Sequence, residues 1–297
     1  MKIGLTALGQ FGIVLISVMP WPAQSLGRQE GLRSDARTYL GFDANDYPGG
    51  AALPRLKQTF AFAGYWLNNP PGSGPPGNSR KNGAESSPWL GHRAALAQQG
   101  FGFLVLFNGR LERELKSVAN ARLLGANDAR AAAAAAEREG FARSTVIFVD
   151  QEEGGSMSDA QMAYLLAWFD AATAAGFRPG IYCSGMPANE GHGEFTITAN
   201  YVRQHAGQRE ISYFVYNDAC PPSPGCAYLK NPPEPAASGV PFAAVWQFAQ
   251  SPRRREFTRR CASAYNADGN CYAPGMGPGS PFIDVESATS ADPSQAR

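Results

Sequence analysis

The chain has 297 residues, with 26 basic and 25 acidic side chains, 33 glycines and 23 prolines. An apolar fraction of 44% with almost no net charge excludes a disordered chain, and the balanced charge argues against nucleic acid as the main partner. The length fits one large α/β barrel or two ordinary domains.

The first 25 residues have the pattern of a signal peptide. Lys2 precedes an apolar stretch over residues 11–19, a Pro-Trp-Pro sequence ends it, and Ala23-Gln24-Ser25 places small residues where a signal peptidase cuts. The alternative is a buried N-terminal helix. The apolar stretch is short for a membrane span, and no other window of the sequence is long and apolar enough to be one. We therefore expect a secreted or periplasmic protein without a stable membrane span after removal of residues 1–25, and a flexible lead over residues 26–38.

Short apolar strands alternate with helical patterns along the rest of the chain. The predicted strands cover residues 39–43, 60–67, 101–107, 145–149, 179–183, 211–216, 243–248 and 282–285. The predicted helices cover residues 53–59, 88–99, 127–139, 158–175 and 194–206. A loop rich in Pro, Gly, Ser and Asn occupies residues 68–86, and loops of this length commonly bind or cover something.

This alternation predicts an α/β fold with parallel strands. Eight strand–helix units in about 250 residues fit a single TIM-type (β/α)8 barrel. Residues 217–281 lack helical patterns, so we expect the barrel to be irregular in its last third. An open doubly wound sheet is the competing architecture, but the expected Gly-rich phosphate turn does not follow the first strand. The predicted barrel domain spans residues 39–290.

Four acidic residues lie at predicted strand ends, where a barrel builds its active site. They are Asp43, Asp150, Glu152 and Asp284. Converging carboxyl groups shift one another's pKa, so one can stay protonated while another is ionised. Cleavage of a glycosidic bond needs both forms: a protonated carboxyl group for the leaving oxygen and an ionised one to stabilise positive charge or activate water. At any single position, a solvated loop residue or a helix cap is the alternative.

Aromatic residues mark the same strand ends and predict a surface for sugar rings. The candidates for substrate binding are Tyr65, Tyr182, Tyr216, Trp246 and Gln247. The alternative is that the aromatic side chains fill the core. Five arginines at positions 253–255, 259 and 260 form a basic cluster, which is either a solvated surface or a contact for an anionic polymer such as a cell wall.

Five cysteines agree with export to an oxidising compartment. Cys220 and Cys226 bracket one short segment and Cys261 and Cys271 another, so on proximity we expect two local disulfides, one of three possible pairings. Cys183 follows a strand pattern and is expected to be a buried, inert thiol. The cysteine and histidine spacings match no metal site, and we expect neither a metal nor a cofactor.

Several of these motifs occur in the order found in a known family. They are Gly41-Phe42-Asp43, Val149-Asp150-Gln151-Glu152, Gly180-Ile181-Tyr182, Trp246-Gln247 and Ile283-Asp284. In this order the chain resembles the family 25 glycoside hydrolases, the Chalaropsis-type lysozymes. Of the two, it is more similar to the bacterial glycoside-hydrolase-like domain of unknown function that is related to them. The resemblance covers residues 39–287. The third strand departs from the lysozyme pattern, because it ends in Leu106-Phe107-Asn108.

The resemblance implies a (β/α) barrel that acts on peptidoglycan, as a lysozyme-like glycosidase of the N-acetylmuramidase type. It implies Glu152 as general acid, Asp150 and Asp284 as assisting groups, and Asp43 in the floor of the site. Tyr182, Trp246 and Gln247 would line the sugar cleft. Two hypotheses follow for this expected monomer: an exported hydrolase of a cell-wall glycan, or a barrel of weak or no activity that binds wall glycan.

Overall fold

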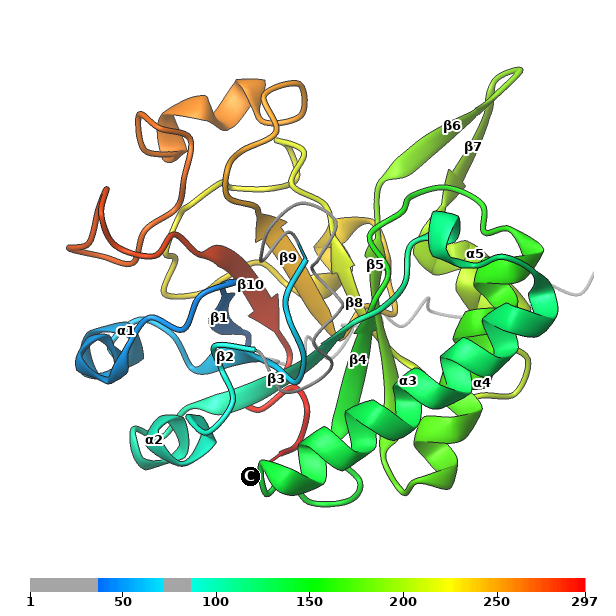
Figure 1. Cartoon of the computed structure of the whole chain (residues 1–297). Coiled ribbons are helices and arrows are strands. Elements are labelled where there is room, and N and C mark those ends of the chain that lie inside the picture. The colour runs from blue at the N-terminus through cyan, green and yellow to red at the C-terminus, as the bar shows by residue number, and fades with distance from the viewer. Residues whose placement is uncertain (1–36, 72–86, 297) are drawn as a thin grey trace, which may run out of the picture. The chain divides into compact units, whose positions relative to one another are not determined.

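The computed structural model describes residues 37–71 and 87–296, and it confirms an α/β barrel. The predicted signal peptide, most of the predicted lead and most of the 68–86 loop lie outside the described residues. Eight strands close the barrel in the order β1-β10-β9-β8-β5-β4-β3-β2 (Figure 1). They are β1 (Tyr39–Asp43), β2 (Phe62–Trp66), β3 (Gly102–Asn108), β4 (Val146–Asp150), β5 (Arg178–Ser184), β8 (Ser212–Tyr216), β9 (Val245–Ala249) and β10 (Asp284–Ala288).

Five helices connect successive strands in the first two thirds of the barrel. They are α1 (Leu53–Lys57), α2 (Arg93–Gln98), α3 (Val118–Arg138), α4 (Asp159–Ala174) and α5 (Thr198–His205). The hydroxyl of Ser117 caps α3, which therefore begins earlier than the predicted residue 127. The helices α3 and α4 pack side by side (Figure 1), and Gly125 permits the contact because a Cβ there would lie 2.1 Å from the Tyr164 carbonyl oxygen.

The prediction of an all-parallel barrel is wrong for its last strand. β10 pairs antiparallel with both β1 and β9, whereas the other neighbouring barrel strands pair in parallel. A parallel strand needs a crossover that returns the chain to the opposite end of the sheet. Residues 250–283 contain no α-helix to provide one, so β10 starts at the end where β9 stops and runs back. Asp284 is accordingly the first residue of its strand, and it lies opposite Asp43.

A hairpin replaces the start of the predicted helix over residues 194–206. β6 (Pro187–Gly191) and β7 (Glu194–Ile197) pair antiparallel, and α5 begins only at Thr198. The turn contains Gly191 and Gly193 with φ of +91° and +81°, a conformation that glycine adopts at little cost. The hairpin extends away from the barrel beyond the end of β5 (Figure 1).

The disulfides cross between segments instead of closing local loops. Cys220 is bonded to Cys261 and Cys226 to Cys271, with Cα–Cα distances of 5.8 and 5.5 Å. The predicted local pairing is therefore wrong. The segments that follow the neighbouring strands β8 and β9 run beside each other, and the Cys220 amide donates to the Phe257 carbonyl oxygen at 3.0 Å. Spatial proximity between these segments thus decides the pairing, and sequence proximity does not.

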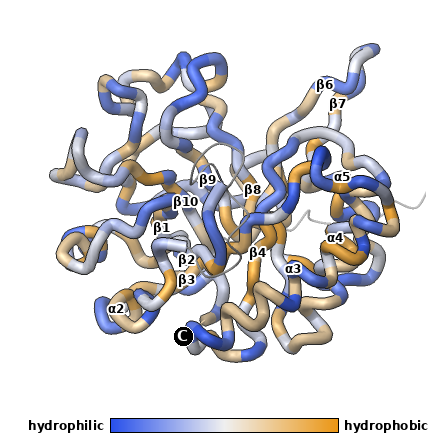
Figure 2. Tube along the Cα trace, in the orientation of Figure 1, coloured by the Kyte–Doolittle hydropathy of each residue, from blue (hydrophilic) through white to orange (hydrophobic). Residues whose placement is uncertain are grey.

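Figure 2 shows that the apolar segments are concentrated in the barrel strands and in parts of the helices that pack on them. Cys183 is buried in β5, and burial raises the pKa of its thiol. Within the described ranges, no helix combines the length and the apolar character that a membrane crossing requires.

Candidate active site

The four predicted acids line one cavity of about 290 Å³ at the end of the barrel where the parallel strands finish. Asp43 ends β1, Asp150 ends β4, and Glu152 follows two residues later. Asp284 reaches the same cavity from the start of β10, because that strand runs in the opposite direction. Carboxyl groups distant in sequence therefore meet in one place.

Gln247 of β9 connects the carboxyl groups at the centre of the cavity. Its Nε2 lies 3.1 Å from Asp43 Oδ2 and 3.3 Å from Asp284 Oδ2. Its Oε1 accepts from the Tyr182 hydroxyl at 2.6 Å and from Gln250 Nε2 at 2.9 Å. These bonds fix the orientation of the Gln247 amide, because its nitrogen must face the two carboxylates.

Burial raises the pKa of two of these acids, Asp43 and Asp284. The pKa of Asp43 is raised to about 6, mainly because burial removes water from its carboxyl group. Hydrogen bonds from neighbouring side chains lower the pKa and offset part of this rise. The pKa of Asp284 is raised well above its ordinary value, first by burial and then by repulsion from Asp43. The cavity therefore holds carboxyl groups that titrate at different pH values, which is the condition for one acid and one base in the same site.

Glu286 is a further acid that the sequence reasoning missed. It is fully buried in β10 and lies opposite Gly41 of β1 and Gln247 of β9. Burial, followed by repulsion from Asp43 and Asp284, raises its pKa well above the ordinary value. The sequence carried a signal, because alternate residues of a strand face the same side and Asp284 and Glu286 are two apart. The predicted strand stopped at residue 285 and left it out.

The segment that carries Glu152 is held by backbone contacts, while the Glu152 side chain is exposed. The Tyr216 hydroxyl donates to the Glu152 carbonyl oxygen at 3.2 Å. Thr198 Oγ1 donates to the Gly155 carbonyl oxygen at 3.0 Å, and the Ser156 amide donates to the Glu190 carboxylate of β6 at 2.7 Å. The hairpin and α5 therefore support the loop that places Glu152 at the rim of the cavity.

Only some of the predicted aromatic residues reach the cavity. Tyr182 lines it, and Tyr216 packs beside Tyr182 with ring centroids 5.5 Å apart. Tyr65 does not line it: the Tyr65 hydroxyl donates to Glu139, and its ring packs on Phe141 outside the barrel. Because side chains alternate along a strand, the next residue of β2, Trp66, lines the cavity instead.

Trp246 is also placed away from the predicted cleft. It is fully buried and its indole Nε1 donates to the Asn217 carbonyl oxygen at 2.9 Å. Its neighbour Gln247 faces the cavity, so the same alternation explains why one residue of the Trp-Gln pair reaches the site and the other does not.

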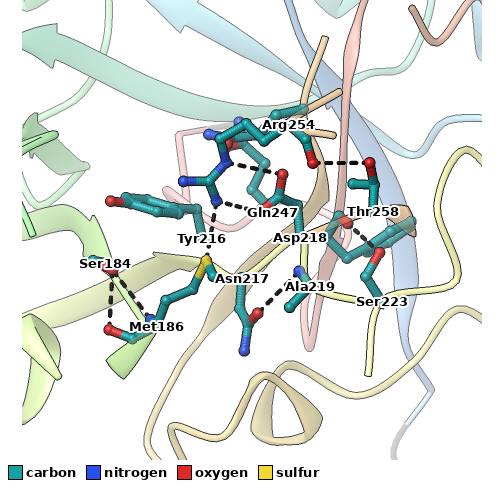
Figure 3. Close-up of polar contacts among 12 residues, drawn as sticks. Ser184, Met186, Tyr216, Asn217, Asp218, Ala219, Ser223, Gln247, Arg254 and Thr258 are labelled. Carbon is teal, nitrogen blue, oxygen red and sulfur yellow. Dashed lines mark hydrogen bonds and ion pairs between the residues drawn. The ribbon is translucent and has the colours of Figure 1, made fainter. Parts of the chain in front are cut away.

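The wall of the cavity after β9 contains a cation. Arg254 lines the cavity and pairs with the buried carboxylate of Asp218, with its Nε 3.0 Å from Asp218 Oδ2 (Figure 3). Its guanidinium carbon lies 5.2 Å from the centre of the Tyr216 ring and 4.8 Å from that of Phe257. Arg254 Nη2 also lies 3.0 Å from Met186 Sδ. Other lining residues on this side are Gln250, Ser251 and Pro252.

In the part of the chain that the structure describes, no three His, Cys, Asp or Glu side chains are grouped so that they could hold a metal ion.

Comparisons with known proteins agree with this architecture. The family model of the Rv2525c-like, glycoside hydrolase-like domain matches residues 74–216. An uncharacterized protein of B. stearothermophilus is 19% identical, with a TM-score of 0.51, over 84% of this chain and 95% of that chain. The family match confirms the glycoside-hydrolase-like barrel that the sequence resemblance implied, and the solved structure shows the same fold.

Two further solved structures are similar at lower scores. The Tat-secreted protein Rv2525c of Mycobacterium tuberculosis, in complex with HEPES, is 13% identical with a TM-score of 0.46, over 84% of this chain and 94% of that chain. The spore cortex lytic enzyme SleM of Clostridium perfringens is 12% identical with a TM-score of 0.47, over 85% of this chain and 68% of that chain. No curated protein matches the sequence.

Proposed function

We propose that this chain, which carries a glycoside-hydrolase-like domain, is an exported glycosidase that cleaves a cell-wall glycan of the peptidoglycan type. The observation that carries the proposal is the convergence of Asp43, Asp150, Glu152 and Asp284 on one cavity. A cluster of acids with separated charge states suits the cleavage of a glycosidic bond, whose transition state needs a proton at one atom and negative charge near another.

In this proposal Glu152 is the general acid. It lies at the exposed rim of the cavity, where it can donate a proton to the leaving glycosidic oxygen and regain one from solvent. As the bond to that oxygen breaks, positive charge develops on the sugar ring, and water adds to the ring carbon and releases its proton to solvent. Ionised Asp43, assisted by Asp150, stabilises that charge across the cavity, while Asp284 keeps a proton over a wider pH range because of its raised pKa.

The other lining residues would hold the sugar. Trp66 and Tyr182 supply apolar ring surface, and Gln250 supplies an amide beside the Tyr182 hydroxyl at 3.1 Å. Apolar sugar faces pack on aromatic rings, and sugar hydroxyl groups exchange hydrogen bonds with amides. Gln247 is already bonded on both ends of its amide, so its main role in the proposal is to position Asp43 and Asp284.

Export is the second element of the proposal. Residues 1–25 have the order of a signal peptide, and two disulfides bridge the segments after β8 and β9. Disulfides of this kind persist in oxidising compartments. Peptide sequencing of the protein recovered outside the cytoplasm should find a chain that starts after Ser25. Recovery of a chain that still begins at Met1 would contradict the signal-peptide assignment.

Glycan binding without cleavage is the competing function, and one feature of the cavity favours it. The third strand contributes the apolar side chain of Leu106 to the lining, so this wall offers no proton donor or acceptor. The two functions give opposite results in one assay. Hydrolysis predicts release of new reducing ends from purified peptidoglycan, whereas binding alone predicts saturable retention on the same material with no product.

A further inference from the structure

A basic segment borders the proposed active site and has no role in the chemistry above. We name residues 253–260 the basic rim: it contains five arginines and a single acid, Glu256. The whole chain has nearly equal numbers of basic and acidic residues, so this is a local excess of positive charge. Its first part reaches the cavity, because Arg254 is one of the lining residues.

The basic rim is held in a fixed conformation. Arg254 forms an ion pair with buried Asp218 (Figure 3), and its guanidinium lies near the rings of both Tyr216 and Phe257. The Thr258 hydroxyl donates to the Arg254 carbonyl oxygen at 2.9 Å. The disulfide of Cys261 then ties the following residues to the segment after β8. A charged surface held in this way needs little ordering when a ligand binds.

Three arginines of the rim face solvent. Arg255, Arg259 and Arg260 are exposed, and the described part of the chain provides no acidic partner within ion-pair distance of them. The segment follows β9 and lies on the side of the barrel from which the β6–β7 hairpin extends (orange in Figure 1). Arg255 directly follows Arg254, which lines the cavity, and Arg259 and Arg260 follow in the same segment.

We propose that the basic rim binds carboxylate groups of the same wall glycan that enters the cavity, and so selects an anionic polymer over a neutral one. This inference rests on the proposed function. The charge complementarity is local, because attraction between exposed charges fades over about 8 Å at physiological salt. The rim would act after encounter, by holding the strand beside the cavity, and Arg254 would continue this surface into the wall of the cavity.

The test compares two forms of one polymer and two variants of matched charge. Purified peptidoglycan and peptidoglycan with its carboxylates converted to amides are incubated with protein, and bound protein is measured by sedimentation at low and high salt. The variant Arg255→Gln/Arg259→Gln/Arg260→Gln removes the exposed rim charges. The control Arg122→Gln/Arg130→Gln/Arg138→Gln removes three exposed charges from α3, which lies on another side of the barrel (Figure 1).

We expect the rim variant to bind untreated peptidoglycan roughly tenfold more weakly at low salt, since three exposed ion pairs are lost. Its binding to the amidated polymer should equal that of the wild type, and the α3 control should bind both polymers as the wild type does. Unchanged binding by the rim variant would overturn the inference, as would equal weakening in the control. Failure of hydrolysis alone would leave the binding comparison intact, so the two proposals are tested separately.

Discussion

Replacement of Glu286 by glutamine should stabilise the protein at neutral pH. The side chain is fully buried, and burial with repulsion from Asp43 and Asp284 raises its pKa well above the ordinary value. In the unfolded chain it titrates near the reference value of 4.5. The folded state therefore binds more protons above that pH, and stability falls as pH rises toward the folded-state pKa.

The size of the effect follows from this difference. Keeping Glu286 protonated at pH 7 costs at most about 3–4 kcal/mol, because each pH unit above the unfolded pKa contributes about 1.4 kcal/mol. Glutamine has nearly the same shape and needs no proton. We expect Glu286→Gln to match the wild type at pH 4 and to exceed its free energy of unfolding by up to that amount at pH 7.

Urea unfolding at a series of pH values, followed by tryptophan fluorescence, measures this difference. The substitution Asp170→Asn serves as the control of opposite sign, because the hydrogen bond from Arg209 lowers the pKa of Asp170. That carboxylate stabilises the folded state above its ordinary pKa, and its contribution is lost as the pH falls. A stability difference for Glu286→Gln that stays constant from pH 4 to pH 8 would refute the reasoning.

Three further predictions follow from the geometry. Cys220→Ala/Cys261→Ala should lower the free energy of unfolding in urea by about 4 kcal/mol, because the bond joins residues 41 apart in sequence. Gly64→Ala should lower the free energy of unfolding by about 1–3 kcal/mol and reduce hydrolysis, because its Cβ would lie 2.3 Å from Asp43 Cβ. Gly277→Ala is the control: open space surrounds this position, so the substitution should change neither thermal stability nor activity. The rate of glycan cleavage should rise as pH increases through about 6, where Asp43 ionises, and a rate unaffected between pH 5 and 7 would contradict its role.

Much of the barrel could be predicted because its signals are local. The strand that ends in Asp150 is a short apolar run, and the strand that ends in Asp43 has the same character. In a parallel barrel such strand ends meet, so the convergence of their acids followed from the strand pattern alone. The capping box of Ser158 and Gln161 also fixed the start of α4.

The errors arise where a long-range contact decides the structure. The direction of β10 depends on the path of residues 250–283, which have no helical or strand pattern of their own. The same path brings Cys261 to Cys220 and Cys271 to Cys226, pairings that spacing along the chain does not encode.

The errors among the candidate site residues are of another kind, because they concern neighbouring side chains on one strand. Tyr65 and Trp66 are both aromatic, and only the barrel interior distinguishes the residue that faces the cavity. Two adjacent aromatic residues therefore suggested a sugar-binding surface. Which of the two faces the cavity could be decided only from the register of β2 in the barrel. Because side chains alternate between the two faces of a strand, one residue of β2 known to face inward would have identified Trp66 as the cavity residue.

The most direct test of the proposed glycosidase is the rate at which Glu152→Gln releases reducing ends from purified peptidoglycan. The adjacent Glu153→Gln is the matched control, since the Glu153 carboxylate accepts hydrogen bonds from Gln161 and the Glu112 amide, which glutamine can still accept. We predict a loss of at least about a hundredfold in Glu152→Gln, as expected for removal of a general acid, and near wild-type rates in the control. Wild-type rates in Glu152→Gln would contradict the assignment of the acid.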